Sequence, residues 1–214
     1  MKNGQIIGKV MHHFNFLTKT SSRFIMLIFL ASFSFACSSI HLSSSERKLI
    51  KESNENIAMC VTLVTEPADS LILRKESQPI KDPTNKLVKH LAKRMHATVN
   101  HPDQKGVGIA APQVGINRRL ILVQRFDKAE KPFEAIINPE ITAHSDSLHS
   151  LTEGCLSIPV IREEVSRPWS ITVKYQDTTG KTITESVSGY TARIFQHEID
   201  HLNGVLFNDR TAAH

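Results

Sequence analysis

The sequence predicts a domain of the α+β class within a chain of 214 residues. Two observations carry this prediction. Apolar residues alternate with polar ones in several short segments between residues 120 and 187, and apolar residues recur at helical spacing before and after them. Strands followed by a helix, with a further helix upstream, are typical of α+β domains. Hydrophobic residues make up 40% of the chain and charged residues 22%, which is ordinary for a globular protein.

The upstream helix is expected to run to about Ala97. The pair Asp82-Pro83 is typical of an N-cap followed by proline at the first helical position. Apolar residues then recur at a spacing of four: Leu87, Leu91 and Met95. This spacing predicts one buried helix face.

Four segments predict strands, and the last two predict a hairpin with one buried face. The strands are expected over residues 120–126, 133–137, 171–175 and 182–187. Asn138-Pro139 is expected to end the second strand, and Thr179-Gly180 is expected to turn the chain between the third and fourth.

The final helix is expected to begin after Ser188, which is a good N-cap, and to end at Gly204. Its spacing places one set of residues in the core: Phe195, Ile199 and Leu202. His197 and His201 then face a different direction from this apolar set.

The stretch from His197 to His201 is an H-E-x-x-H motif. Two histidines four residues apart lie on one helix face and are able to bind one metal ion, while Glu198 reaches a water on that ion. This pattern indicates a metal-activated water that attacks a carbonyl group. Asp200 is not expected to be a ligand; it orients a neighbouring group or caps local backbone.

The third metal ligand is expected upstream of the motif. One large class of such enzymes continues as H-E-x-x-H-x-x-G-x-x-H, but Phe207 stands where that third histidine would be. Terminal His214 is expected to be a frayed end. Cys155, between Gly154 and a proline turn, is the candidate, because a thiolate with two imidazoles leaves a fourth position for water. The alternative is that Cys155 is a small buried hydrophobe.

The glycine-containing stretch at residues 106–115 is expected to be a backbone strip that a peptide lies against. Gln113 would offer an amide N–H to a substrate carbonyl. A phosphate loop is not indicated, because neither G-x-G-x-x-G nor Gly-Lys-Ser/Thr is completed. An ordinary tight loop that enters the next strand is the alternative.

These segments together resemble the peptide deformylase family. G-V-G-I-A-A-P-Q, E-G-C-L-S-I-P and Q-H-E-I-D-H-L-N-G stand in the family's order, and the resemblance runs from about Leu71 to Asp209. It implies antiparallel sheets around a central C-terminal helix that carries H-E-x-x-H. It also implies hydrolysis of the formyl group from N-formylmethionine on nascent polypeptides, with release of formate.

The resemblance assigns roles by motif. Cys155, His197 and His201 would bind one divalent metal ion, usually Fe²⁺ and in some preparations Zn²⁺ or Ni²⁺, and Glu198 would be the general base and acid. The other assigned positions are the oxyanion donors Gln113 and the backbone N–H of Leu156, and the substrate-flanking Gly108 and Gly154.

Three further positions are candidates for substrate contact. Ile194 and Tyr190 precede His197 by about one and two helical turns and would line a pocket for the methionine side chain, although plain core packing is the alternative. Arg162 would meet a substrate carbonyl or lie solvated at the surface. Glu153 and Arg167 are expected to pair and to brace the cysteine loop.

The charge of the chain does not indicate nucleic-acid binding. The formal charge is +5, but residues 1–60 hold seven Lys/Arg against three Asp/Glu, so the body from residue 61 carries only +1. Three cysteines are too few and too scattered for a disulfide framework, and Cys60, at the edge of the domain, is expected to have a packing role.

The N-terminal segment, residues 1–60, resembles a signal or lipoprotein leader and polar tether, and residues 61–214 are expected to be the catalytic domain. The apolar run at 24–36 is too short to span a membrane comfortably, and a box resembling a lipoprotein cleavage site ends at Cys37. A lipidated Cys37 would anchor the chain to a membrane, whereas the implied function is cytoplasmic. An organellar targeting segment and a start near Met59 are the alternatives.

The tail is too short for a stable helix that could dock on the ribosome, so any ribosome contact is expected to use another surface. Two rival functions remain open at this point: a neutral metallopeptidase, and a non-catalytic domain with a structural metal site. The sequence leaves open the metal in vivo, the oligomeric state, and substrate preference beyond formyl-Met.

Overall fold

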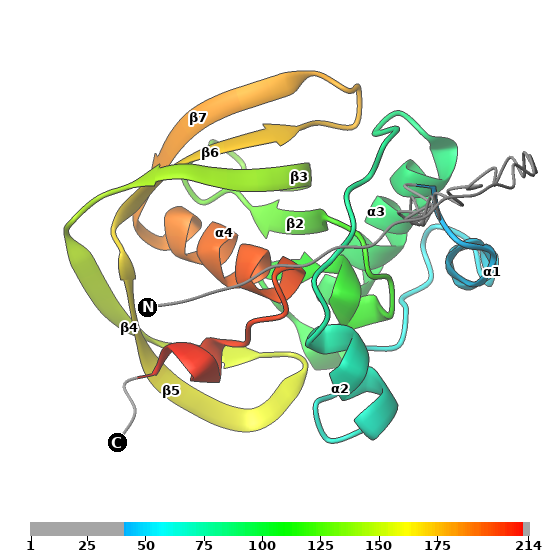
Figure 1. Cartoon of the computed structure of the whole chain (residues 1–214), viewed down its shortest axis with the longest axis horizontal. Helices are drawn as coiled ribbons and strands as arrows, with labels where there is room; N and C mark the ends of the chain where they lie inside the picture. Colours follow the sequence, from blue (N-terminus) through cyan, green and yellow to red (C-terminus); the bar gives the residue numbers. More distant parts are fainter. Residues whose placement is uncertain (1–40, 212–214) are drawn as a thin grey trace, which may run out of the picture. The chain divides into compact units, whose positions relative to one another are not determined.

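A computed structural model of the chain describes residues 41–211 (Figure 1). The expectations about the apolar run at 24–36, about Cys37 and about His214 lie outside the described residues. Within the described part, no helix is long and apolar enough to cross a membrane.

The described residues form helices near both ends and strands between them. The α-helices are α1 (Ser44–Lys51), α2 (Pro67–Leu73), α3 (Lys86–Val99) and α4 (Gly189–Leu202). The 3₁₀ helices are η1 (Pro102–Gln104), η2 (Ala111–Val114) and η3 (Phe207–Arg210). The strands are β1 (Gly108–Ala110), β2 (Leu120–Gln124), β3 (Phe133–His144), β4 (Leu148–Cys155), β5 (Ile158–Pro168), β6 (Ser170–Gln176) and β7 (Thr182–Ser188).

Both sheets are antiparallel, which confirms the predicted α+β class. Five strands pair in the order β1-β2-β3-β6-β7, and β4 and β5 form a separate two-stranded sheet. The predicted hairpin is β6–β7, and Gly180 turns between them with a φ of 86°. A positive φ at this turn favours glycine because a side chain would be strained there.

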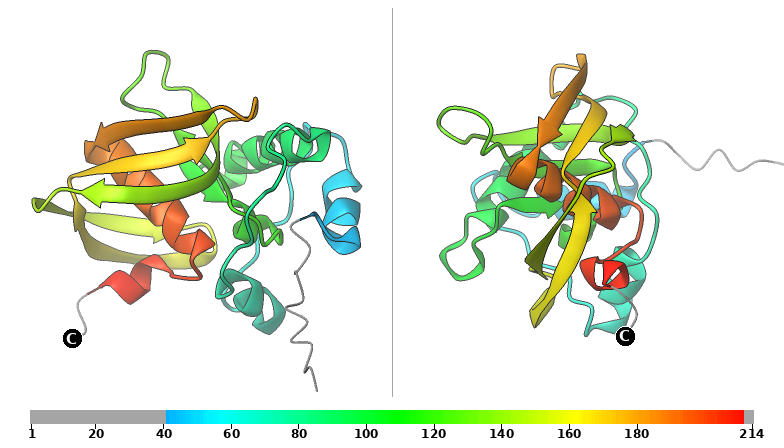
Figure 2. Two further views of the ribbon diagram at one scale, coloured as in Figure 1. Left: turned by 45° about the horizontal axis from the view of Figure 1, so that its top comes forward. Right: turned by 90° about the vertical axis from the view of Figure 1, so that its left-hand side faces the viewer.

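Helix α4 lies between the five-stranded sheet and the β4–β5 hairpin, and α3 covers the other side of β2 (Figure 2). Strand β2 is therefore buried on both faces. Leu120 and Leu122 pack in the cluster that contains α3, whereas Ile121 and Val123 pack in the cluster that contains α4. Alternation along the strand sends successive side chains to opposite faces, which explains its continuous apolar run.

Two predicted boundaries were wrong. Helix α3 begins at Lys86 rather than Pro83, because Asn85 accepts the N-terminal backbone N–H of Leu87 while Asp82 caps a turn through Thr84. Strand β3 continues past Asn138, where a register shift and a φ of 52° absorb the proline that was expected to end the strand.

Four features were not expected from the sequence. Helices α1 and α2 and the hairpin β4–β5 had no predicted counterpart. Cys60, expected to have a packing role at the edge of the domain, is exposed. Helix α1, upstream of residue 61, begins at a capping box formed by Ser43 and Glu46 and packs beside α3, where Ile50 is fully buried.

Candidate active site

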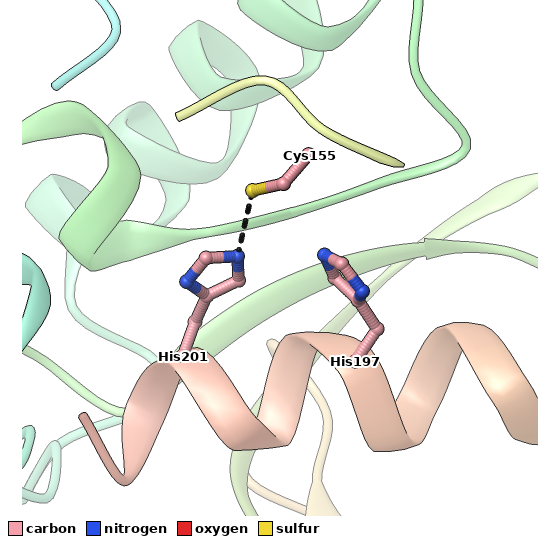
Figure 3. A group of neighbouring side chains, drawn as sticks. All are labelled: Cys155, His197 and His201. Carbon is pink, nitrogen blue, oxygen red and sulfur yellow. Dashed lines mark hydrogen bonds between the residues drawn. The ribbon is translucent and has the colours of Figure 1, made fainter. Parts of the chain in front are cut away.

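Three potential metal ligands converge at the inner face of α4 (Figure 3). Cys155 ends β4, and His197 and His201 are one helical turn apart on α4. The ligand atoms of the three side chains lie within 4.8 Å of one another, and Cys155 Sγ is 3.2 Å from His201 Nε2. The thiol and the two imidazoles therefore face one point, as a three-ligand zinc-type or iron-type site requires.

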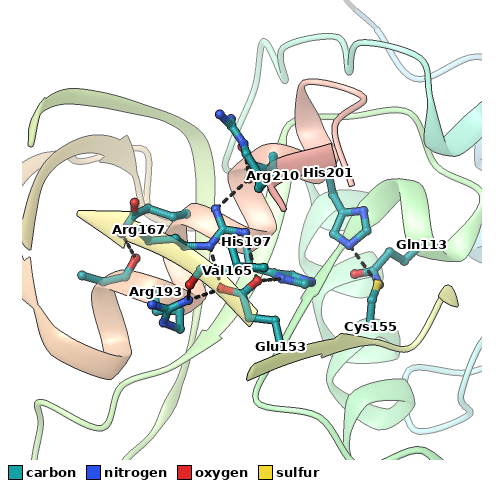
Figure 4. Close-up of polar contacts among 12 residues, drawn as sticks. Gln113, Glu153, Cys155, Val165, Arg167, Arg193, His197, His201 and Arg210 are labelled. Atoms are coloured by element: carbon teal, nitrogen blue, oxygen red, sulfur yellow. Dashed lines mark hydrogen bonds and ion pairs between the residues drawn. The ribbon is translucent and has the colours of Figure 1, made fainter. Parts of the chain in front are cut away.

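The orientation of His197 is set by Glu153 (Figure 4). The His197 Nδ1–H donates to Glu153 Oε2 over 2.9 Å, which leaves Nε2 as the ring nitrogen that faces Cys155 and His201 and would bind a metal ion. Burial raises the pKa of Glu153, but the hydrogen bonds from His197 and Arg167 outweigh it and hold that pKa far below its usual value. Glu153 is thus an ionised acceptor.

Glu153 is itself held by two arginines. Arg167 donates to both of its oxygens over 2.7 and 3.0 Å, and Arg193 donates to Oε1 over 2.5 Å. The expected pairing of Glu153 with Arg167 is confirmed. Asp200 accepts from Arg167 over 2.7 Å, so it orients a neighbouring group, as expected.

The thiol of Cys155 is suited to ligation. Burial raises its pKa, but the charge of His201 and the hydrogen bonds from both histidines outweigh burial and lower the pKa well below the usual value. The thiolate is the form that binds a metal, and a bound cation would replace the proton that the thiolate and the imidazoles share.

Glu198 is placed to handle a proton beside the three ligands. Its side chain is 4% exposed, and its Oε2 is buried without a hydrogen-bond partner among the described residues. Burial raises the pKa of Glu198 to about 7. A buried carboxylate oxygen without a partner, on a residue that lines the same cleft as Cys155 and His197, fits a hydrogen bond to a metal-bound water, so the residues present agree with the implied metal ion.

Gln113 reaches the same point from η2. Its Oε1 accepts the backbone N–H of Ala110 over 2.8 Å, which fixes the orientation of the amide. The Nε2 group then points to Cys155 Sγ at 3.4 Å and to Ser157 Oγ at 3.3 Å. The amide N–H is therefore directed at the cluster rather than at solvent.

A cleft of about 310 Å³ opens over the cluster. It brings together almost all of the predicted site residues: Gly108, Gln113, Gly154, Cys155, Leu156, Arg162, Tyr190, Ile194, His197 and Glu198. His201 does not line the cleft, and it is 1% exposed. Tyr190 is half exposed at the mouth and Ile194 is buried.

Arg193 is a cleft residue that the sequence interpretation missed. It stands four residues before His197, so helical spacing brings it to the same face of α4. Its guanidinium is satisfied by Glu153 and by the backbone carbonyls of Val165 and His149. The spacing of four residues between Arg193 and His197 could have predicted that Arg193 lies beside the site.

The comparisons with known proteins agree with this arrangement. The family model described as "Polypeptide deformylase" matches residues 61–214. A peptide deformylase of Thermotoga maritima is 46% identical over 139 residues, which cover 65% of this chain and 80% of that protein.

Two solved structures share the fold. The crystal structure of the Thermotoga maritima enzyme has a TM-score of 0.65 at 39% identity and covers 73% of this chain and 99% of that one. A class I type b peptide deformylase from Acinetobacter baumannii with Met-Ala-Ser bound has a TM-score of 0.63 at 35% identity, with the same two coverages.

A cysteine, two histidines and a glutamate at the end of a peptide-sized cleft define the class of metal-dependent amide hydrolases. Within that class, the chain belongs to the peptide deformylase family. It is a hydrolase that acts on N-formylated nascent peptides, and the family uses a metal ion.

Proposed function

We propose that this chain removes the formyl group from N-formylmethionine through Cys155, His197 and His201 as ligands of one divalent ion. The observation that carries the assignment is the convergence of their ligand atoms within 4.8 Å beside buried Glu198. A bound ion would lower the pKa of a coordinated water toward ~7 and polarise the formyl carbonyl.

The surrounding residues would transfer the proton, stabilise the developing charge and orient a metal ligand. Glu198 accepts the proton of the attacking water and delivers it to the leaving amine nitrogen. The Gln113 amide and the backbone N–H of Leu156 donate to the formyl oxygen as negative charge develops on it, each worth about 3 kcal/mol by the precedent of other oxyanion holes. Glu153 holds the Nδ1 side of His197, so that Nε2 would be the nitrogen that binds the ion.

The substrate would lie along the cleft between β1 and β4. Gly108 and Gly154 flank its backbone, Tyr190 and Ile194 line the pocket for the methionine side chain, and Arg162 meets a backbone carbonyl. The common lining of one cleft by these residues supports this placement. The Met-Ala-Ser ligand of the Acinetobacter baumannii relative supports a peptide of this length.

We further propose Fe²⁺ as the bound ion, with Zn²⁺ and Ni²⁺ able to replace it, because thiolate and imidazole ligands suit all three. The proposed place of action is the cytoplasm, where formylated chains are made. Anchoring through a lipidated Cys37 is the alternative, and mass spectrometry of the native N-terminus decides between them.

The test is formate release from formyl-Met-Ala-Ser by the full chain loaded with Fe²⁺ without oxygen. Glu198→Ala should keep the metal and lose turnover by orders of magnitude, whereas Cys155→Ala should lose the metal. Near-normal turnover of the first variant, or full metal occupancy of the second, would refute the assigned role. Cleavage of unformylated peptide without formate would refute the activity itself.

A further inference from the structure

Phe207 lies directly against the candidate ligand His197. The two rings are nearly parallel, with an interplanar angle of 21° and centroids 6.1 Å apart. Phe207 is 1% exposed and belongs to an apolar cluster against which Cys155 also packs. Phe207, which stands where a third histidine would be, therefore stacks on one face of the His197 imidazole. Glu153 holds the Nδ1 edge of the same imidazole.

A chain of ion pairs leads from Arg210, three residues after Phe207, to Glu153 at the Nδ1 edge of His197 (Figure 4). Arg210, at the end of η3, donates to both oxygens of Asp200 over 2.7 and 3.2 Å. Asp200 accepts from Arg167 over 2.7 Å, and Arg167 donates to both oxygens of Glu153. Asp200, Arg167 and Glu153 are at least 93% buried, whereas the Arg210 side chain is half exposed.

Arg167 is shared between two carboxylates, so the charge on Asp200 matters to Glu153. When Arg210 partly neutralises Asp200, the Arg167 guanidinium is free to hold Glu153 with two hydrogen bonds. Without Arg210, the buried charge of Asp200 attracts the Arg167 guanidinium more strongly. The hydrogen bonds from Arg167 to Glu153 then weaken. Buried charges interact strongly because little water screens them.

We propose that two residues of the segment Leu206–Arg210, Phe207 and Arg210, are positioning residues for His197. Phe207 fixes the face of the imidazole, and Arg210 fixes its edge through Asp200, Arg167 and Glu153. The inference rests on the proposed role of His197 as a metal ligand. Groups that orient a ligating histidine change metal affinity by about 10- to 100-fold when they are removed.

The experiment uses the full chain loaded with Co²⁺, whose visible absorption reports ligand geometry, and measures the dissociation constant by competition with a chelator. Phe207→Leu and Arg210→Gln should each weaken Co²⁺ binding about tenfold and shift the visible bands. Arg210→Lys keeps the charge and should restore part of the affinity.

Matched controls separate positioning from loosening of the segment. Arg74 pairs with Asp209 of the same segment but does not touch the charged chain, so Arg74→Gln should leave both readouts unchanged. Leu206→Val trims the same apolar cluster without removing a ring, and it should leave the visible bands in place. Arg210→Gln should add no further loss in a Glu153→Gln background, because its effect passes through Glu153.

The outcomes distinguish the inference from the proposed function. A wild-type chain that binds no Co²⁺ would overturn the proposed metal site. A wild-type chain that binds Co²⁺, with Phe207→Leu and Arg210→Gln unchanged in both readouts, would overturn the positioning role alone. Equal losses in Arg74→Gln and Arg210→Gln would also overturn it, since both would then reflect general loosening.

Discussion

Gly108→Ala should displace the carboxylate of Glu198 and lower turnover about 100-fold without loss of metal. A Cβ at position 108 would lie 2.5 Å from Glu198 Oε1 and 2.7 Å from Ile194 Cγ2, whereas ordinary contacts are 3.4–4 Å. Strand β1 is held in register with β2, where Gly108 pairs with Val123. The backbone is therefore less free to move than the end of the glutamate side chain.

The size of the effect follows from these distances. Restoring normal contact requires the carboxylate to move by about 1 Å, and a displacement of that size at a reacting group costs about 100-fold in rate. Overpacking of this kind also costs about 1–3 kcal/mol of stability. The φ of Gly108 is not in the positive region, so no backbone strain adds to the steric effect.

The assay is the steady-state rate of formate release, with kcat and KM separated and metal content measured on the same sample. Gly154→Ala is the control, because its Cβ would meet the exposed and flexible Arg162 side chain at 3.1 Å. A fall in kcat is expected for Gly108→Ala only. A rise in KM alone would mean that the methyl group blocks substrate, and unchanged kinetics with metal bound would refute the reasoning.

Two further predictions concern stability. Burial raises the pKa of Glu46, but its hydrogen bonds with Arg118 outweigh this and lower the pKa from 4.5. The stabilisation is therefore present above pH 4.5 and is lost as pH falls through the lowered pKa, so urea midpoints of wild type and Glu46→Gln should differ at pH 7 and converge in acid. Arg125 is 1% exposed and pairs with three partly buried carboxylates, so Arg125→Met should cost about 3 kcal/mol in urea unfolding, and an unchanged midpoint would contradict this.

The elements that could be predicted from sequence are those whose burial is periodic along the chain. Strand β6 buries every second residue, and the apolar residues of α4 recur at helical spacing although most of the helix is buried, so local spacing indicates both elements. Strand β4 exposes most of its residues, and β5 buries only a few, including Ile158 and Val165. These two strands are held by pairing with each other and have no regular apolar face. The local sequence pattern therefore did not predict the hairpin.

In the candidate site too, local spacing predicts some placements, and contacts between distant residues set the others. The spacing of His197 and His201 places them on one helix face, whatever the rest of the chain does. The approach of Cys155 to this face was inferred by elimination and by resemblance, because its distance from α4 is set by the hairpin. The links of Arg167 to Glu153 and Asp200 join residues 14 and 33 positions apart, where local spacing carries no information about contact.

The segment just upstream of the family match is held by the body of the domain through buried charge. Arg94 of α3 is 3% exposed and donates to backbone carbonyls at both ends of that segment, including Leu49 and Ile57. Arg118 holds Glu46 over 2.8 Å by two hydrogen bonds. A chain that began near Met59 would deprive the Arg94 guanidinium of these acceptors, and a buried cation without acceptors is costly. Residues 44–58 and the catalytic body therefore stabilise each other, and a start near Met59 would yield a less stable domain.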